Sequence, residues 1–182
     1  APLSARTGAR SHAMMDMCLD GSIGMLYLLG SDPVAVMPDK MKTASALKAL
    51  DLLVVQDAFM SETARLADIL LPAPTYGEED GSYINNEGRI QRAQKVREPT
   101  FGAYPAAAVF ASVARAFGQT LGPETAPEIY QEMVALVPSY KGIEFDAAAD
   151  NGTFGKPWRD KAAVDKAGSG GSMEPVPDGL QL

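Results

Sequence analysis

One cysteine and one histidine are the side chains best suited to chemistry in this sequence, and they lie close together as His12 and Cys18. A thiolate beside an imidazole can act as a nucleophile if the fold holds both at hydrogen-bond distance. The pair could also supply two metal ligands, but a closed zinc site takes about four ligands and an iron–sulfur cluster about four thiolates. A single cysteine also excludes an internal disulfide bond. We therefore predict that Cys18 is an inert, buried small hydrophobe and His12 a surface residue, with no catalytic residue and no metal site in the chain.

Two acidic residues follow predicted strands and are the candidates for a ligand site. Asp32 lies in the turn that begins at Gly30, and Asp57 follows a second apolar run. Open parallel sheets bind ligands beyond the carboxyl ends of their strands, where a carboxylate could accept hydrogen bonds from a guanine or a ribose. However, no glycine-rich phosphate loop opens a helix. The residues alone therefore favour the alternative, in which Asp32 belongs to an ordinary turn and Asp57 precedes a helix.

Two runs of like charge are also candidates. The acidic triplet at residues 78–80 could gather a hard cation, but the residues after it add no ligand at calcium-loop spacing, so we predict solvated loop charges. A basic series follows, which we interpret as an ordinary exposed face, with an acidic partner protein as the alternative. Its members are Arg89, Arg92, Lys95 and Arg97.

Short strands that alternate with helices are expected to position these side chains. Apolar runs at residues 25–29, 52–55 and 68–71 are typical of strands, and the first predicts a strand buried on both faces. Helices are predicted at Lys42–Leu50 and after Ser61, which can cap a short helix. Connections of this length favour parallel strands with right-handed crossovers. The predicted fold class is α/β, an open parallel sheet with flanking helices.

The second half of the chain predicts two further helices. The segment 76–96 has turn dipeptides but too little alternation for a firm hairpin prediction. One helix is expected between Pro105 and Gly118, and another between Pro127 and Pro138. Each has an apolar stripe at helical spacing. The stripes are formed by Ala106, Val109, Phe110, Val113 and Phe117 in the first helix and by Ile129, Met133 and Leu136 in the second.

These patterns divide the chain into three parts. Residues 1–22 are predicted as an irregular N-terminal arm that can become helical near His12–Leu19, residues 23–138 as the α/β domain, and residues 139–182 as an extended or flexible tail. The tail contains the linker-like run GSGGS and few large apolar residues. We expect it to pack near Trp158 and to be cleaved rapidly after Lys161 or Lys166 in the isolated chain.

The charge balance and the short apolar runs exclude two classes of partner. A net charge of −7 and a pI near 4.7 oppose an extended phosphate-binding surface, so no nucleic-acid partner is expected. No apolar run reaches the ~18 residues of a membrane helix, and no secretory signal is visible, so no direct membrane insertion is expected. Because the sequence starts at Ala1 rather than at Met, we expect a fragment of a longer polypeptide.

A set of segments between Leu26 and Gly118 resembles one family. The set resembles the molybdopterin-oxidoreductase superfamily, in the form found in the large iron–sulfur subunit (the G subunit) of bacterial NADH–quinone oxidoreductase, respiratory complex I. The segments that carry the resemblance are Leu28–Pro33, Leu47–Asp51, Leu52–Ala64, Ala67–Ala73, Glu78–Gly81 and Asn86–Gln91.

The resemblance implies one of the dinucleotide-binding-like α/β domains that flank a pterin cofactor in this superfamily. In the complex I form the domain carries no molybdenum and is structural bulk beside the iron–sulfur chain. It therefore implies a non-catalytic scaffold with no cofactor of its own and with iron–sulfur clusters elsewhere in the parent subunit. The implied partners are other subunits of the peripheral arm, and the implied location is cytoplasmic, peripheral to the inner membrane through the complex.

A molybdenum enzyme is the alternative. In NAD-linked formate dehydrogenases, the same domain helps to hold a molybdopterin guanine dinucleotide, which implies a pterin-nucleotide pocket lined by Gly30, Asp32, Asp57 and Thr63. The turn at residues 86–89 is more similar to the complex I form. The molybdenum enzymes continue into a β-rich domain after the last α/β element, and no strand-rich run follows Gly118 in this sequence. Both observations favour the scaffold.

Overall fold

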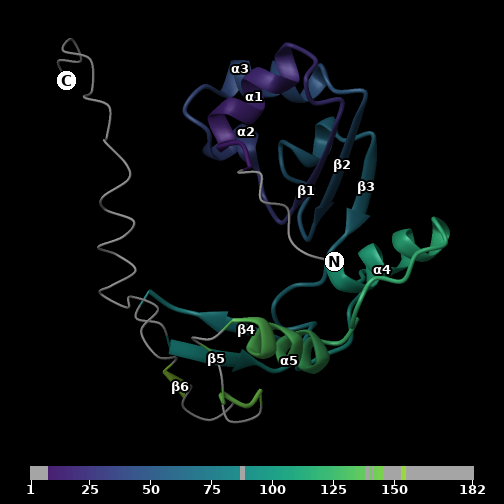
Figure 1. The fold of residues 1–182 in the computed structure, drawn as a ribbon. Helices are drawn as coiled ribbons and strands as arrows, with labels where there is room; N and C mark the ends of the chain where they lie inside the picture. The colour runs from purple at the N-terminus through teal and green to yellow at the C-terminus, as the bar shows by residue number, and fades with distance from the viewer. Residues whose placement is uncertain (1–7, 87–88, 138–139, 141, 146–152, 155–182) are drawn as a thin grey trace, which may run out of the picture. The chain divides into compact units, whose positions relative to one another are not determined.

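The computed structural model of this protein describes residues 8–86, 89–137, 140, 142–145 and 153–154 (Figure 1). The chain forms two compact units, each made from separate stretches of sequence. Residues up to 81 and residues 93–126 belong to the first unit, and residues 82–92 and those from 127 onward belong to the second. This division differs from the predicted boundaries at residues 22 and 138, because the segment 82–92 groups with residues that follow it much later in the chain.

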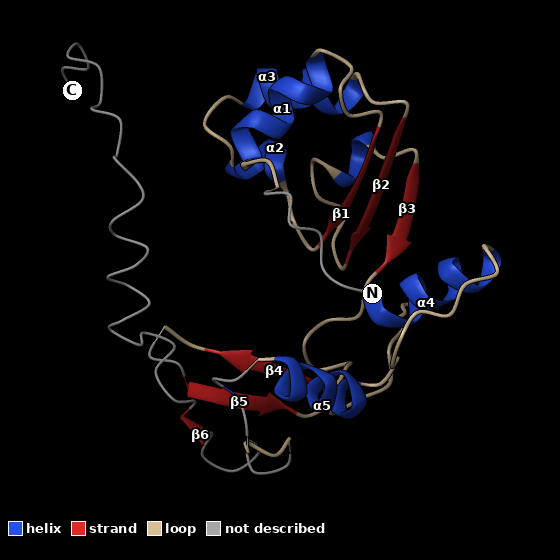
Figure 2. Ribbon diagram, in the orientation of Figure 1, coloured by secondary structure: helices blue, strands red, loops and turns tan. Residues whose placement is uncertain are grey.

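A three-stranded parallel sheet forms the centre of the first unit (Figure 2). The strands are β1 (Met25–Leu29), β2 (Leu52–Asp57) and β3 (Ile69–Pro72), in the order β1-β2-β3. β2 pairs with both neighbours, with Met25 beside Leu52 and Val54 beside Ile69. The predicted α/β class with an open parallel sheet is therefore confirmed.

Three helices gather on one side of this sheet, where they cover the core (Figure 1). They are α1 (Ser11–Leu19), α2 (Pro33–Val36) and α3 (Lys40–Lys48), and the short 3-10 helix η1 (Ala64–Leu66) precedes β3. The core contains residues from the helix layer and from the sheet, and each of these residues is almost fully buried. Alternate side chains of β2 point toward the helices. The main contributors are Met15, Cys18, Ala46, Leu47, Leu53 and Val55.

The N-terminal arm is helical at Ser11–Leu19, where the sequence indicates that it can become helical, because Met15 and Cys18 lie on one face of α1 and become buried in the core. One prediction for this unit needs correction. The strand β1 is not buried on both faces, since the side chains of Met25 and Leu29 at its ends are 55% and 48% exposed. The helix layer of α1, α2 and α3 covers only one face of the sheet.

The helix α4 (Ala106–Ala116) begins directly after Pro105 and is followed by Gly118 at a φ of +70°, as the sequence predicts. Its predicted apolar stripe is largely exposed, however. The buried residue of the helix is Ala111, whereas Val113 and Phe117 face solvent. Within the stripe, the ring of Phe110 lies 4.9 Å from the ring of Tyr27 in β1.

The second unit combines a small sheet with one helix. The strands β4 (Gly81–Ile84), β5 (Arg89–Ala93) and β6 (Thr153–Phe154) lie in that order, and β5 pairs antiparallel with β6. The helix α5 (Ala126–Leu136) buries Tyr130, not the predicted stripe, whose residue Leu136 is 72% exposed. The ring of Phe145 lies against Tyr130 and therefore selects the buried face of α5.

Several predictions for the C-terminal part fall on residues that the structure does not describe. Trp158, Lys161 and Lys166 are outside the described residues, as is most of the predicted tail. In the described part of the chain, no helix is both long enough and apolar enough to cross a membrane.

Candidate functional site

The first strand ends at Gly30, which has the left-handed φ of +56° that favours glycine. Its N–H donates to the carbonyl of Gln56 over 2.8 Å and so extends the pairing of β1 with β2. No atom lies within 4 Å of the point where a Cβ would stand. The backbone conformation, rather than a close neighbour, therefore accounts for the glycine.

The carboxylate of Asp32 accepts hydrogen bonds from two segments, the start of α2 and the loop after β2. Its Oδ1 accepts from the N–H of Ala35, which caps α2, and from the N–H of Thr63 over 3.1 Å. Its Oδ2 accepts from the N–H of Glu62 over 3.2 Å. Burial opposes ionisation, but the hydrogen bonds from Thr63, Glu62 and Ala35 outweigh it and hold the pKa of Asp32 below its usual value. Asp32 is therefore a charged connector between the turn after β1 and the loop after β2.

Thr63 completes this connection from the other side. The residue is fully buried, its Oγ1 donates to Asp32 Oδ1 over 2.5 Å, and the same oxygen accepts from the N–H of Val34 over 3.1 Å. Both hydrogen-bonding capacities of the hydroxyl are used within the fold. A ligand could reach Thr63 only if the turn opened.

Asp57 has a separate set of partners. Its side chain accepts from the N–H of Phe59 over 3.1 Å and from the hydroxyl of Ser61 over 3.3 Å. Ser61 in turn accepts from the N–H of Ala64, which agrees with its predicted capping role at the short helix. Asp57 therefore starts a polar turn of its own, beside the one that Asp32 and Thr63 hold together.

The four residues predicted to line a pterin-nucleotide pocket thus lie at one edge of the sheet, but the side chains serve the fold. Thr63 is inaccessible, and the carboxylates of Asp32 and Asp57 accept from neighbouring backbone and hydroxyl groups. In this arrangement the set does not fit a nucleotide, which would need those acceptors to face outward. Their role as a ligand pocket stays a prediction.

Sequence reasoning missed Gln56, which it assigned to a polar loop. The residue belongs to β2 and is fully buried. Its Oε1 accepts from the hydroxyl of Tyr27 over 2.6 Å, and its Nε2 donates to the carbonyl of Tyr104 over 2.8 Å. Gln56 therefore joins the sheet to the segment that leads into α4. The available signal was a glutamine that directly continues the apolar run of residues 52–55.

The prediction of solvated charges at residues 78–80 is wrong for Glu78. Its side chain is only 5% exposed and accepts from the N–H of Thr75 over 2.9 Å and from Nε of Arg97 over 2.9 Å. Hydrogen bonds from the Thr75 backbone and from Arg97 lower the pKa of Glu78 to about 2, against a smaller opposing effect of burial. The carboxylate is a structural ion-pair partner.

The four cations of the predicted basic face belong to two different units. Arg97 pairs with Glu78, and Lys95 pairs with Glu98 over 2.7 Å. The guanidinium of Arg92 lies 4.6 Å from the ring centre of Phe145, in the second unit. These cations therefore divide between the two units, with Arg89 and Arg92 in the second and Lys95 and Arg97 in the first.

Cys18 and His12 behave as predicted. Cys18 is 1% exposed on the core side of α1, whereas His12 is exposed. Burial, followed by the nearby charge of Asp20, raises the pKa of the Cys18 thiol and keeps it protonated and unreactive. Over the residues that the structure describes, no group of three or more potential metal ligands comes together.

Comparisons with known proteins agree with this fold. A family model described as molybdopterin oxidoreductase matches residues 3–116. Acetylene hydratase from Pelobacter acetylenicus is similar in structure, with a TM-score of 0.54 and 23% identity over 59% of this chain and 15% of the hydratase chain. At that identity, the likeness shows the fold alone.

Curated relatives include two kinds of oxidoreductase. The G 2 subunit of NADH-quinone oxidoreductase from Rhizobium meliloti is 43% identical over 162 residues, which is 87% of this chain and 19% of the relative. The alpha subunit of F420-dependent formate dehydrogenase 2 from Methanococcus maripaludis is 37% identical over 71% of this chain and 20% of the relative. A putative formate dehydrogenase of Staphylococcus haemolyticus is 37% identical over 79% of this chain and 15% of its own length. The chain spans about a fifth or less of the length of these relatives.

Proposed function

Because this chain belongs to the molybdopterin oxidoreductase family, we propose that it is a non-catalytic scaffold domain of the peripheral arm of NADH–quinone oxidoreductase, within the large iron–sulfur subunit. The observation that carries the proposal is its similarity to the NADH-quinone oxidoreductase subunit of Rhizobium meliloti, which is 43% identical and extends over 87% of the chain. The formate dehydrogenases are similar at 35–37% identity over shorter parts of the chain.

The polar groups at the sheet edge support a scaffold role. Asp32 and Thr63 hold the loops after β1 and β2 to one another, and the two loops contain the positions where a family member would contact a nucleotide. Side chains that already satisfy each other are suited to rigid structure and poorly suited to binding a further ligand. We infer that the chain needs no cofactor of its own and that iron–sulfur clusters belong to other parts of the parent subunit.

The proposed partners are other subunits of the peripheral arm, which would hold the domain at the cytoplasmic side of the inner membrane. Exposed apolar side chains are consistent with a domain that is covered in an assembly, since large apolar patches on a surface usually mark contacts. Met25, Val113 and Phe117 are among those in the first unit.

Affinity purification from the native host tests this proposal. A tag on the chromosomal gene should co-purify the subunits of NADH–quinone oxidoreductase, and the tagged complex should oxidise NADH with a quinone acceptor. Metal analysis of the isolated chain should find neither molybdenum nor iron in stoichiometric amount. Stoichiometric molybdenum on the chain, or co-purification of a formate-oxidising complex instead, would refute the proposal.

The second candidate is a domain of a molybdenum-dependent formate dehydrogenase that holds part of a molybdopterin guanine dinucleotide. The similarity to the formate dehydrogenases of two organisms favours it. Under this candidate, Asp32 and Asp57 would have to exchange their present partners for the nucleotide. The same purification distinguishes the two candidates, because only the second predicts guanine nucleotide released from the denatured complex together with molybdenum.

A further inference from the structure

The turn at residues 100–103 exposes an aromatic ring in an unfavourable backbone conformation. The N–H of Ala103 donates to the carbonyl of Thr100 over 3.1 Å, and the two central residues, Phe101 and Gly102, have φ values of +55° and +69°. Glycine adopts such values freely, but a phenylalanine does so at a cost in free energy. The side chain of Phe101 is 97% exposed, so packing within the described part of the chain offsets little of this cost.

This turn is fixed to the first unit on both sides. After it, Ala103 is buried, and the carbonyl of Tyr104 accepts from Nε2 of the buried Gln56 in β2 over 2.8 Å. Before it, Nε of Arg97 donates to the side chain of Glu78 over 2.9 Å. The base of the turn is therefore held by the sheet and by the segment that follows β3. A ring that a fixed backbone presents loses little conformational entropy on binding, which favours its use as an interface anchor.

Two further apolar side chains lie on the segments that hold the turn. Val96 is 81% exposed and Tyr76 is 78% exposed. The N–H of Val96 donates to the carbonyl of Gly77 over 2.9 Å, which sets the two segments side by side. We refer to these segments, residues 75–80 and 95–104, as the Phe101 surface. Aromatic side chains are enriched in protein interfaces and are prominent among the residues that contribute most to binding.

The Phe101 surface is acidic. It contains four carboxylates and two cations. Arg97 pairs with Glu78, and Lys95 pairs with Glu98, so two carboxylates are in excess. The whole chain also has a net charge of −7. A protein partner with a basic rim is therefore attracted to this surface, whereas an anionic lipid surface or an acidic protein is repelled.

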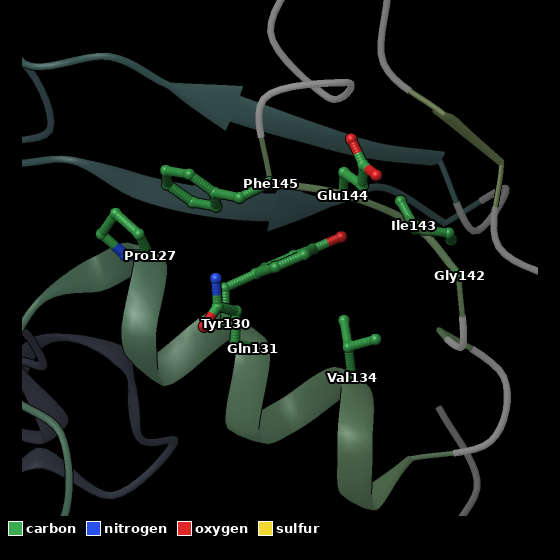
Figure 3. Close-up of a pocket in the computed structure, with 8 residues that line it drawn as sticks. All are labelled: Pro127, Tyr130, Gln131, Val134, Gly142, Ile143, Glu144 and Phe145. Carbon is green, nitrogen blue, oxygen red and sulfur yellow. The ribbon is translucent and has the colours of Figure 1, made fainter.

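A second copy of this chain is a poor occupant of the Phe101 surface. The second unit has a cavity of about 470 Å³ between α5 and residues 142–145 (Figure 3), which is large enough for an aromatic ring. However, the charged residue among those that line the cavity is Glu144. Its carboxylate would face the acidic Phe101 surface and oppose the contact.

We propose that Phe101 is an aromatic anchor that inserts into an apolar pocket with a basic rim on another subunit of the peripheral arm of NADH–quinone oxidoreductase. Val96 and Tyr76 pack around the anchor, and cations of the partner face the carboxylates of the Phe101 surface. The inference rests on the proposed function, because it takes the partner from the same complex. It explains why a strained and exposed phenylalanine is present, since the gain in binding offsets the cost in stability.

Photo-crosslinking in the native complex tests the identity of the partner. Phe101→p-benzoylphenylalanine introduces a photoreactive analogue of the same side chain, and illumination should join the tagged protein to another subunit of the complex. Mass spectrometry should place the adduct among apolar residues with Lys or Arg nearby. The matched control is Phe59→p-benzoylphenylalanine, at another exposed phenylalanine of the first unit, which should not give this adduct.

The variant Phe101→Asn tests the anchor without unfolding the protein, because asparagine tolerates the backbone of this turn better than phenylalanine does. Partner subunits should leave the immobilised complex at least about tenfold faster than from the original protein. Phe59→Asn makes the same change at an ordinary backbone conformation and should leave that rate unchanged. Glu98→Lys reverses an exposed charge and should also accelerate dissociation, most strongly at low salt.

The inference is overturned if the probe at position 101 crosslinks only within its own polypeptide, to a second copy, to lipid or to nothing. It is also overturned if Phe101→Asn leaves the dissociation rate unchanged, or if Glu98→Lys slows dissociation. Failure of the proposed function has a different result, because the tagged protein would then not co-purify with NADH–quinone oxidoreductase at all.

Discussion

Asp32 and Thr63 lie 31 residues apart in the sequence and are joined by two hydrogen bonds, one from the backbone N–H of Thr63 and one from its hydroxyl. This contact fixes the loop after β2 against the turn after β1. Because Thr63 Oγ1 also accepts from the N–H of Val34, the start of α2 depends on the same pair. The edge of the sheet where ligands bind in open α/β folds is therefore built around a closed polar network.

Replacing the carboxylate of Asp32 should destabilise the first unit. Asp32→Ala removes the acceptor of Glu62 and Thr63 and leaves the buried N–H and hydroxyl of Thr63 without this partner, for which we expect a loss of about 3 kcal/mol in the free energy of unfolding. Urea denaturation followed by circular dichroism measures it. The matched control is Asp39→Ala, which removes only the cap of α3 and should cost about 1 kcal/mol. Equal losses in the two variants would mean that the network adds nothing beyond an ordinary cap.

Protonation of Glu78 should weaken the fold in acid. The folded-state pKa of about 2 is below the ordinary value of 4.5, so the unfolded chain binds the proton more tightly. The contribution of Glu78 is therefore fully present above pH 4.5 and is lost as the pH falls toward about 2. Urea midpoints measured across this range should drop more steeply in the original protein than in Glu78→Gln. The exposed Glu98 supplies the control, because Glu98→Gln should leave the slope nearly unchanged.

Substitution of Gln56 should destabilise the fold more than the place of this residue near the end of a strand suggests. Gln56→Leu preserves bulk but leaves the hydroxyl of Tyr27 and the carbonyl of Tyr104 without their partner, at an expected cost of about 2 kcal/mol. Tyr27→Phe removes only one hydrogen bond and should cost about 1 kcal/mol. In the double variant the losses should be less than additive, because both substitutions remove the same hydrogen bond. Full additivity would argue that the two side chains do not interact.

Phe101 is a site where a substitution should stabilise the protein. It has a φ of +55°, its side chain is 97% exposed, and the following Gly102 also has a positive φ. The N–H of Ala103 donates to the carbonyl of Thr100, which closes a turn of the kind that favours Asn-Gly. Phe101→Asn should raise the free energy of unfolding by about 0.5–1 kcal/mol.

The control for this substitution is Phe117→Asn, at another exposed phenylalanine with an ordinary backbone conformation. It should give no such gain. Thermal unfolding of the three proteins compares them directly. A lower melting temperature for Phe101→Asn would show that the exposed ring makes a contact that outweighs the strain of the turn.

The sheet and its helices could be predicted because their signals are local. The apolar runs at residues 25–29 and 52–55 give strands, and Pro105 with Gly118 correctly brackets α4. The face that each helix buries depends on its partners, so an apolar stripe at helical spacing did not show which side of α4 would be covered.

The buried polar residues could not be recognised for a related reason. The amide of Gln56 is satisfied by Tyr104, 48 residues later, and Glu78 by Arg97, 19 residues later. The sequence does not show which distant residue will be the partner. A buried glutamine therefore cannot be told from a glutamine in a loop. Asp32 and Asp57 were singled out because their turns combine an apolar run with a following acidic residue, and their role as ligand groups stays a prediction.

The way the chain passes between its two units has a consequence for its synthesis. The segment 82–92 leaves the first unit, and its companions in the second unit begin only at residue 127, after the 34 residues 93–126. At about 10 residues per second, a ribosome needs about 3 s to produce those residues. During that interval the fully buried Ile90 and the pairing edge of β5 have no companion from α5 or β6. Nascent chains should therefore be most exposed to aggregation and to chaperone binding at this point of translation, before the residues from 127 onward are made.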